Sequence, residues 1–254
     1  QREEFKRLGI WGQWDDPYMT LAPEYEGKQI ELFGIMAEKG YIYRDLKPVY
    51  WCSDCGTALA EAEIEYHDHK SPSIYVAFTV NEGRGILEEG QVRFVIWTTT
   101  PWTIPANLAI SLHPNAQYVE IDSSQGRLVV AEALLDTFIA ETKLENTAIL
   151  RRWQGLELEG ITCRHPLYER DSLVIVGDHV TLDAGTGCVH TAPGHGQEDY
   201  IVGQKYHLPI FAPVDDQGRF TDEALQYAGL TLADGNKAVT KDLEAAGALL
   251  SLAF

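Results

Sequence analysis

Apolar residues recur at different spacings in two parts of the chain. Within residues 22–40, Ile30, Phe33 and Met36 follow one another at helical spacing, and Gly40 stands where a helix commonly ends. From about residue 71 onward, short apolar runs bounded by turn-forming residues predict strands at 73–80, 91–100, 116–121, 126–131, 173–180, 187–192 and 209–214. Helical patterns interrupt these strands at 131–142, 196–208 and 236–250.

The order of these elements predicts an α+β fold. Strands and helices do not alternate regularly, which disfavours a doubly wound nucleotide-binding fold. A strand-rich β-barrel core, closed or partly closed and decorated with helices, fits the pattern better. Pro72 marks a boundary, so we expect a short N-terminal stem over residues 1–70, with one helix and a Cys-x-x-Cys segment, and a main domain over residues 71–254.

The composition is that of a water-soluble protein. Hydrophobic residues make up 45% of the 254 positions, and no apolar run approaches the ~18 residues that would indicate a membrane span. The chain begins at Gln1 without the features of a signal peptide, and we expect it to be a section of a longer protein. Four cysteines are compatible with a reducing compartment, so we expect a cytoplasmic protein, an organelle being the other option.

The formal net charge of −18 disfavours binding to a nucleic-acid backbone over a large surface. Affinity for phosphates normally rests on clustered lysine and arginine. An interpretation that involves RNA therefore needs most of the RNA contacts to come from elsewhere.

Three threonines end the predicted strand at 91–100. Because side chains alternate between the faces of a strand, Thr98, Thr99 and Thr100 place hydroxyl groups on both faces just before Pro101 stops the strand. Such a polar shelf can hold a water molecule or a carbonyl group without carrying charge. The alternative is structural, because threonine is common in strands and turns.

A glycine-rich stretch at 183–200 surrounds a second group of polar residues. Its glycines indicate close approach to the backbone around a strand that contains His190, and Asp199 lies in the first turn of the helix that follows. Asp199 is also what a helix dipole favours at that position, and a strand histidine is commonly a hydrogen-bonded core residue.

A metal site is a third interpretation of this stretch. His190, His195 and Asp199 are spaced so that they could converge on a zinc ion across a turn. No HExxH helix, P-loop or Gly-x-Ser-x-Gly nucleophile motif is present. Cys52 and Cys55 form half of a zinc knuckle, and no second close pair exists in the chain. We interpret them as two free thiols or as a half-site completed beyond residue 254.

Two long motifs carry a resemblance to a known family. The segments "WTTTPWTIPANLAI" and "GTGCVHTAPGHGQEDY" resemble the signature regions of the editing domain inserted in bacterial-type isoleucyl-tRNA synthetases. Thr100 and Trp102 favour the isoleucine type, because the valine and leucine types typically have Thr-Thr-Arg-Pro here. "GIWGQWDDPYMTL" and "VYWCSDCGTALAEAEIEY" resemble the stem that joins this insert to the catalytic domain. The "HIGH" and "KMSKS" signatures of the synthetic site are absent.

The resemblance implies a hydrolase that removes a wrong amino acid. The expected reaction is cleavage of the ester of mischarged valyl-tRNA(Ile), with valyl-adenylate as a possible second substrate, by an oriented water molecule and without a cofactor. The expected partners are the 3′ acceptor end of tRNA(Ile), the mischarged valyl group and the remainder of the synthetase chain, with no membrane. We expect a monomer.

The resemblance also assigns roles to residues. It implies that Asp199 binds the α-ammonium group of the substrate, and that Thr99 and Thr100, with Thr98 on the same shelf, line the acyl pocket and place substrate and water. His190 is expected to limit the size of the pocket. Trp102 and Asn107 are expected to flank it, Trp102 against the terminal adenosine, whereas Cys188 is expected to have no role.

Two other function classes stay open at the level of sequence. The chain could guide the acceptor strand without hydrolytic activity of its own. It could also be a metal-dependent hydrolase that uses His190, His195 and Asp199.

Overall fold

The computed structural model describes all 254 residues, which form two compact units, Gln1–Leu46 and Lys47–Phe254. The predicted boundary near residue 71 lies inside the second unit. The assignment of residues 1–70 to a stem and of 71–254 to an editing domain therefore stays a prediction.

The first unit contains two helices, α1 (Arg2–Arg7) and α2 (Pro23–Glu38), and neither helix has a buried residue. α2 confirms the helix predicted within residues 22–40. Proline is favoured in a first helical turn because its missing N–H would have no partner there, and Pro23 stands in that position. Gly40 follows the helix with a φ of +75°, a conformation that glycine adopts at little cost.

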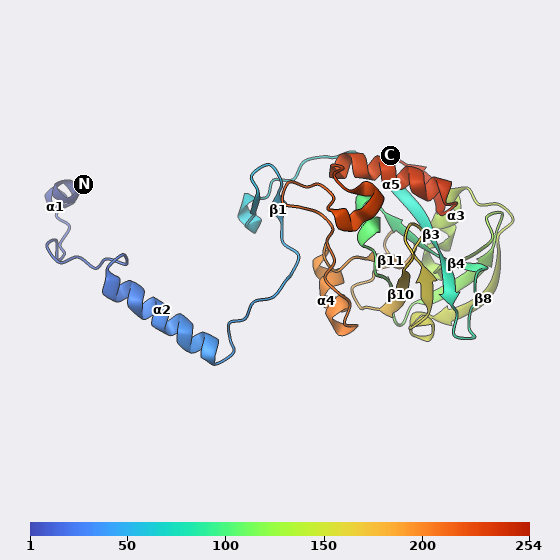
Figure 1. The fold of residues 1–254 in the computed structure, drawn as a ribbon, viewed down its shortest axis with the longest axis horizontal. Helices are drawn as coiled ribbons and strands as arrows, with labels where there is room; N and C mark the ends of the chain where they lie inside the picture. Colours follow the sequence, from blue (N-terminus) through green and yellow to red (C-terminus); the bar gives the residue numbers. More distant parts are fainter. The chain divides into compact units, whose positions relative to one another are not determined.

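The second unit begins with a small hairpin and continues into a six-stranded barrel (Figure 1). Strands β1 (Trp51–Cys52) and β2 (Thr57–Ala58) pair antiparallel in the hairpin. The barrel strands follow one another in the order β3 (Ser73–Glu82), β9 (Thr162–Arg164), β10 (Asp171–Val176), β5 (Ala109–Leu112), β11 (Cys188–Thr191) and β4 (Val92–Thr98). The barrel is closed because β4 also pairs antiparallel with β3. The predicted α+β fold with a barrel core is thus confirmed.

Side chains along β3 point alternately to its two faces, so the strand contributes to two hydrophobic cores. Ile74, Val76, Phe78 and Val80 belong to the core inside the barrel, where Phe78 has no exposed surface. Burial of one such side chain stabilises the fold by roughly 1.5–3 kcal/mol. Tyr75 and the other odd-numbered residues point to the opposite face of the strand, and Tyr75 belongs to a second core.

Further strands and helices surround the barrel. Strands β7 (Arg127–Ala131), β6 (Gln117–Asp122) and β8 (Ala148–Gln154) extend the sheet from β4, and β12 (Leu249–Ala253) adds to β3. The helices are α3 (Leu135–Thr142), α4 (Gln197–Lys205) and α5 (Leu232–Ala245), with short 3₁₀ turns between strands, of which η2 (Pro101–Ala106) is central to the site.

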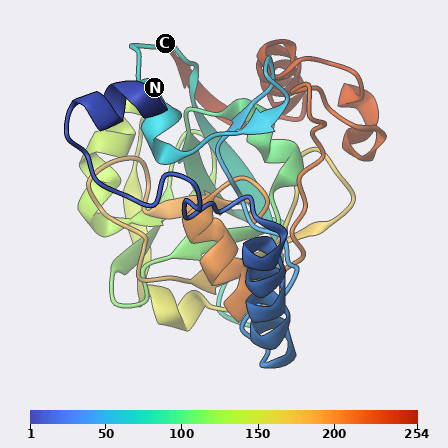
Figure 2. The same ribbon diagram turned by 90° about the vertical axis from the view of Figure 1, so that its left-hand side faces the viewer.

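Each of the larger helices packs on a different part of the barrel. α3 contributes Leu135 and Phe138 to the second core. α4 packs outside the barrel, where Val202 meets Ala109 of β5 and Ile175 of β10, and Figure 2 shows α4 in front of the strands. No helix combines the length and the hydropathy that crossing a bilayer requires.

Most predicted elements are confirmed, and one is wrong. The segment 209–214 forms no strand, and only a single bridge joins Val214 to Phe220. Pro209 and Pro213 lack the N–H groups that a strand ladder needs, which explains the failure. Strands β2, β5, β8, β9 and β12 were not predicted. β9 has only three residues, and β8 is an edge strand without a buried residue, so neither has a clear hydrophobic pattern.

Candidate active site

Two neighbouring strands bring the polar motifs together. β4 and β11 run parallel and pair at Trp97 and Val189, so their carboxyl ends lie at the same end of the barrel. The threonine cluster follows β4, and the glycine-rich turn into α4 follows β11. Residues that are about ninety positions apart in the sequence therefore line one site.

The site is a cavity of about 240 Å³. The sequence-predicted residues that line it come from both motifs and are Thr98, Thr100, Trp102, His190 and Asp199. Thr103, Ala192, His195 and Gly196 complete the lining. Two predicted residues do not line it: Thr99 is exposed and its carbonyl accepts a hydrogen bond from the Ser71 hydroxyl, and Asn107 is fully buried behind His190.

The threonine cluster is shaped by local hydrogen bonds. The Thr98 hydroxyl accepts a hydrogen bond from the backbone N–H of Thr100 at 3.0 Å, which turns the chain at the end of β4. Pro101 then begins η2, and the Thr103 hydroxyl donates to the Thr100 carbonyl at 2.9 Å. The turn thereby holds the Thr98 and Thr100 side chains on the cavity wall.

His190 is held by hydrogen bonds at both ring nitrogens. Asn107 Nδ2 lies 2.8 Å from His190 Nδ1, and Nδ2 can only donate, so Nδ1 carries no proton. The proton of the neutral ring is then on Nε2, which donates to Thr103 Oγ1 at 2.9 Å. Asn107 is itself oriented, because it also donates to the Ala109 carbonyl at 2.9 Å and accepts from the Ser172 hydroxyl.

The electrostatics keep His190 neutral. Burial, helped by the nearby His195 and Arg170, lowers its pKa to about 3. With both nitrogens occupied and a low pKa, His190 is poorly suited to take a proton from water. This geometry favours the interpretation of His190 as a fixed wall of the cavity.

Asp199 presents one carboxylate oxygen that has no partner in the protein. It lies in the first turn of α4, and its Oδ2 accepts the backbone N–H of Ala192 at 2.8 Å. Burial raises the pKa of Asp199, and the Ala192 hydrogen bond only partly opposes this effect. An ammonium group bound at Oδ1 would offset the cost of burying the carboxylate. Gly196 permits a close approach to this carboxyl group, because a Cβ there would come within 3.1 Å of Asp199 Cγ and Oδ2.

Trp102 and His195 form the outer wall of the cavity. Their rings meet edge to face with centroids 5.0 Å apart. The backbone N–H of Trp102 donates to Asn236 Oδ1 of α5 at 2.9 Å, so a distant helix fixes the start of η2. Burial lowers the pKa of His195 to about 4, which keeps this ring neutral near pH 7.

Sequence reasoning missed several residues of the site. Thr103 could have been found, since a hydroxyl three residues after Thr100 can bond back to its carbonyl. Asn236 and Ser172 carry no sequence signal, because only the folded chain brings them to η2 and Asn107.

The residues of this site do not form a metal-binding group. No cluster of three or more histidine, cysteine, aspartate or glutamate side chains in the chain is arranged to hold a metal ion. In the β1–β2 hairpin, the Cys55 N–H donates to Cys52 Sγ at 3.3 Å, which lowers the pKa of the Cys52 thiol. These two thiols could supply two of the four ligands that structural zinc requires. The zinc half-site stays a prediction.

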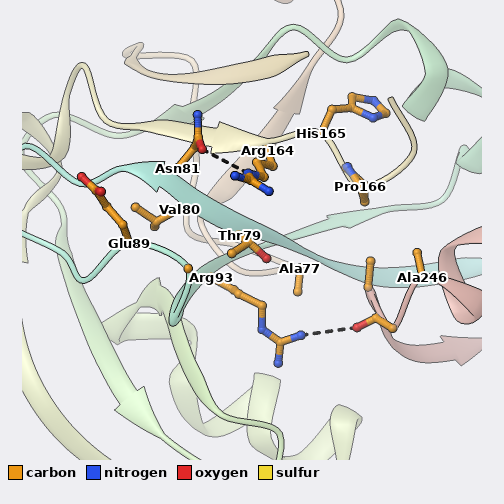
Figure 3. A pocket seen from close by; sticks show the side chains of 13 residues that line it. Ala77, Thr79, Val80, Asn81, Glu89, Arg93, Arg164, His165, Pro166 and Ala246 are labelled. Atoms are coloured by element: carbon orange, nitrogen blue, oxygen red, sulfur yellow. Dashed lines mark hydrogen bonds between the residues drawn. The ribbon is translucent and has the colours of Figure 1, made fainter. Parts of the chain in front are cut away.

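A larger cavity lies elsewhere in the chain. It has a volume of about 750 Å³ and is lined by residues of β3, β4 and β9 and of the turn between α5 and β12 (Figure 3). None of the sequence-predicted site residues lines it. We place the candidate active site in the smaller cavity, because that cavity combines a half-buried carboxylate with hydroxyl groups at converging strand ends.

Comparison with known proteins identifies the family. Residues 1–211 match the family model of the class I tRNA synthetases (I, L, M and V). The chain is 60% identical to the isoleucine–tRNA ligase of Natranaerobius thermophilus and 55% identical to that of Bacillus subtilis. Both alignments cover the whole chain, which spans 28% of the length of each relative.

Solved structures of editing domains share the fold. The P. falciparum cytosolic leucyl-tRNA synthetase editing domain aligns with a TM-score of 0.56 and 11% identity, over 73% of this chain and all of that chain. The CP1 domain of GlLeuRS aligns with a TM-score of 0.55 and 13% identity, over 72% of this chain and 99% of that chain. The resemblance seen in the sequence is thus confirmed: the chain aligns with a section of isoleucine–tRNA ligases, has the fold of an editing domain, and belongs to the class I tRNA synthetase family.

Proposed function

We propose that this chain hydrolyses the ester of valyl-tRNA(Ile), and that the 240 Å³ cavity holds the valyl group. The observation that carries the proposal is the Asp199 carboxylate, which lines a small cavity together with Thr98 and Thr100 and has a hydrogen bond within the protein at Oδ2 alone. A carboxylate in that position suits the α-ammonium group that distinguishes an aminoacyl ester from other esters.

The physical need for such a site follows from the limits of binding selectivity. One methylene in an apolar pocket is worth only about 1–3 kcal/mol, so a synthetic site cannot strongly reject a smaller amino acid. A second site that admits only the smaller group can remove it after transfer. In this proposal, the rigid wall of His190, Thr103 and Trp102 excludes the larger isoleucyl group.

The hydrolysis needs positioning more than strong acid–base catalysis. The Asp199 carboxylate holds the α-ammonium group, and the hydroxyls of Thr98 and Thr100 orient the ester carbonyl and a water molecule. The water oxygen bonds to the carbonyl carbon, the bond from this carbon to the ribose oxygen breaks, and that oxygen leaves with one of the two protons of the water. The products are valine and uncharged tRNA. No step requires His190 to accept a proton.

Thr99, which the sequence analysis placed in the acyl pocket, has a different role in this proposal. Its side chain is exposed and does not line the cavity, although its carbonyl bonds Ser71. We propose that Thr99 acts through its backbone, by fixing the turn between Thr98 and Thr100. Asn107 likewise acts through His190 rather than by touching the substrate.

We propose tRNA(Ile) and the remainder of the synthetase as the partners of this chain. The cavity receives the 3′ acceptor end of tRNA(Ile), and the remainder of the synthetase chain supplies most of the tRNA contacts, because a charge of −18 gives this section little affinity of its own. We also propose that the chain acts as a monomer in the cytoplasm, that it needs no cofactor for hydrolysis, and that valyl-adenylate is a second substrate.

The test compares hydrolysis of valyl-tRNA(Ile) and isoleucyl-tRNA(Ile) by the chain at low salt, with and without a chelator. We expect faster loss of the valyl ester that is unaffected by the chelator. Equal rates for the two esters would contradict the assignment of the cavity, and activity that the chelator abolishes would favour the metal-dependent alternative. Binding of tRNA with no hydrolysis of either ester would favour the guiding role instead.

A further inference from the structure

Arg170 is a half-buried positive charge without a counter-ion. It lies at the end of the loop that joins β9 to β10, between Glu169 and Asp171 in the sequence. Burial lowers the pKa of Arg170, and Tyr168 opposes this effect, whereas no carboxylate does. Removal of a guanidinium group from water is costly unless other contacts compensate. The contacts that Arg170 makes therefore indicate its role.

The loop that contains Arg170 holds the end of η2. The Arg170 guanidinium donates to the Pro105 carbonyl, and His165 Nε2 donates to the preceding carbonyl, of Ile104, at 2.8 Å. The loop is itself closed, because the His165 N–H donates to the Arg170 carbonyl at 2.9 Å. Two successive carbonyls of η2 are thus bound from one loop. This end of η2 leads directly to Asn107, the residue that orients His190.

Aromatic rings hold the same guanidinium group. Its central carbon lies 5.0 Å from the centre of the Tyr168 ring and 5.3 Å from that of the Phe211 ring, distances at which a cation is attracted to a ring. Phe211 in turn packs on the turn that precedes α4, where a Cβ at Gly194 would collide with the Phe211 carbonyl. Arg170 is therefore connected, through Phe211, to the turn that leads to Asp199.

We propose that Arg170 sets the width of the 240 Å³ cavity, and thereby its discrimination between a valyl and an isoleucyl group. One wall of this cavity comes from η2 and the other from the turn before α4. Arg170 does not line the cavity but contacts the support of each wall, so it is a positioning residue that touches no substrate. The inference rests on the proposed function, because it concerns the selectivity of the same site.

The shape of arginine suits this role better than that of other side chains. A planar guanidinium can donate at its edge to the Pro105 carbonyl while its faces pack on aromatic rings. Methionine would keep a similar volume but could make neither contact. Lysine would keep the charge, but its single ammonium group lacks the planar fork. We therefore expect the two walls to be held less firmly in Arg170→Met and, to a smaller extent, in Arg170→Lys.

The first test compares the rates at which the chain hydrolyses valyl-tRNA(Ile) and isoleucyl-tRNA(Ile) in single turnovers. Arg170→Met should lower the ratio of the two rates at least several-fold, mainly through faster isoleucyl hydrolysis, because a looser wall admits the extra methylene. Arg170→Lys should lower it less. Arg164→Met is the matched control, since Arg164 is exposed on β9 and donates to Asn81. A native ratio in folded Arg170→Met, or an equal fall in Arg164→Met, would overturn the proposal.

Hydrogen exchange provides a second test that does not depend on hydrolysis. The N–H groups of Thr103 and Asn107 donate to the carbonyls of Thr100 and Ile104, at 3.1 and 2.9 Å. Arg170→Met should speed exchange of these two amides and leave the amides of β3 at their native rates.

No acceleration, or equal acceleration throughout the chain, would overturn the proposal. If the native chain hydrolyses neither ester, the proposed function fails, and the exchange rates alone decide whether Arg170 holds η2. If Arg170→Met does not fold, Arg170→Lys replaces it in both tests, and a native ratio together with native exchange in that variant would contradict the inference.

Discussion

Replacement of Asn107 by aspartate should change the protonation of His190. In the native protein, the Asn107 amide donates to His190 Nδ1 at 2.8 Å and to the Ala109 carbonyl at 2.9 Å. A carboxylate cannot donate at either position. Nδ1 must then carry the proton, either in the other neutral tautomer or in the imidazolium form.

The magnitude follows from the geometry. An anion in hydrogen-bond contact raises the pKa of a histidine by about 1–3 units, which is roughly 1.4–4 kcal/mol in favour of the charged ring. The pKa of His190 should therefore rise clearly from its native value of about 3. The Ala109 carbonyl loses its side-chain donor, so the free energy of unfolding should fall by about 1–3 kcal/mol near pH 7.

The assay is a titration of the imidazole resonances by NMR, together with denaturant unfolding. Loss of one resonance in His190→Gln assigns the signal among the eight histidines of the chain. Asn115→Asp is the control, because Asn115 is exposed. A native His190 pKa near 6.5 would contradict its burial, and no rise in Asn107→Asp would refute the hydrogen-bond assignment.

Three further predictions follow from the site. Gly196→Ala should leave the fold intact but slow valyl-ester hydrolysis at least several-fold, since the new Cβ meets the Asp199 carboxyl group at 3.1 Å; an unchanged rate would contradict the tight approach. Asn236→Ala should reduce the free energy of unfolding by about 1 kcal/mol and shift Trp102 fluorescence, because the backbone N–H of Trp102 loses its acceptor. Denaturant unfolding and emission spectra check the two effects. The free energy of unfolding should fall as the pH is lowered from about 6.5 towards 4, because three histidines have lowered pKa values and the unfolded chain binds protons first; a flat profile in denaturant titrations across this range would contradict their burial.

The sequence predicts the strands whose hydrophobic pattern is strong. β3, β4, β6 and β7 alternate or run continuously apolar because they face the cores, and the structure confirms them. β8 and β9 escape prediction because an exposed edge strand and a three-residue strand carry no such pattern. Closure of the barrel depends on pairings between distant strands, which periodicity does not encode.

The sequence also predicts part of the candidate site, because several of its residues lie in recognisable motifs. Thr98, Thr100, His190 and Asp199 lie in two long motifs, so the sequence marks them without giving their distances. The exposure of Thr99, and the position of Asn107 behind His190 instead of in the cavity lining, depend on how the turn after β4 folds. The contribution of α5 through Asn236 depends on tertiary packing alone.

The most direct test of the account is single-turnover hydrolysis of valyl-tRNA(Ile) by Asp199→Asn, with Glu198→Gln beside it. Both residues lie in the first turn of α4, but Asp199 lines the cavity and the exposed Glu198 does not. We predict that Asp199→Asn lowers the rate at subsaturating enzyme by about tenfold or more, through loss of a charge-assisted contact, while Glu198→Gln keeps the native rate. Equal rates for the two variants would contradict the assignment of Asp199 as the anchor for the substrate.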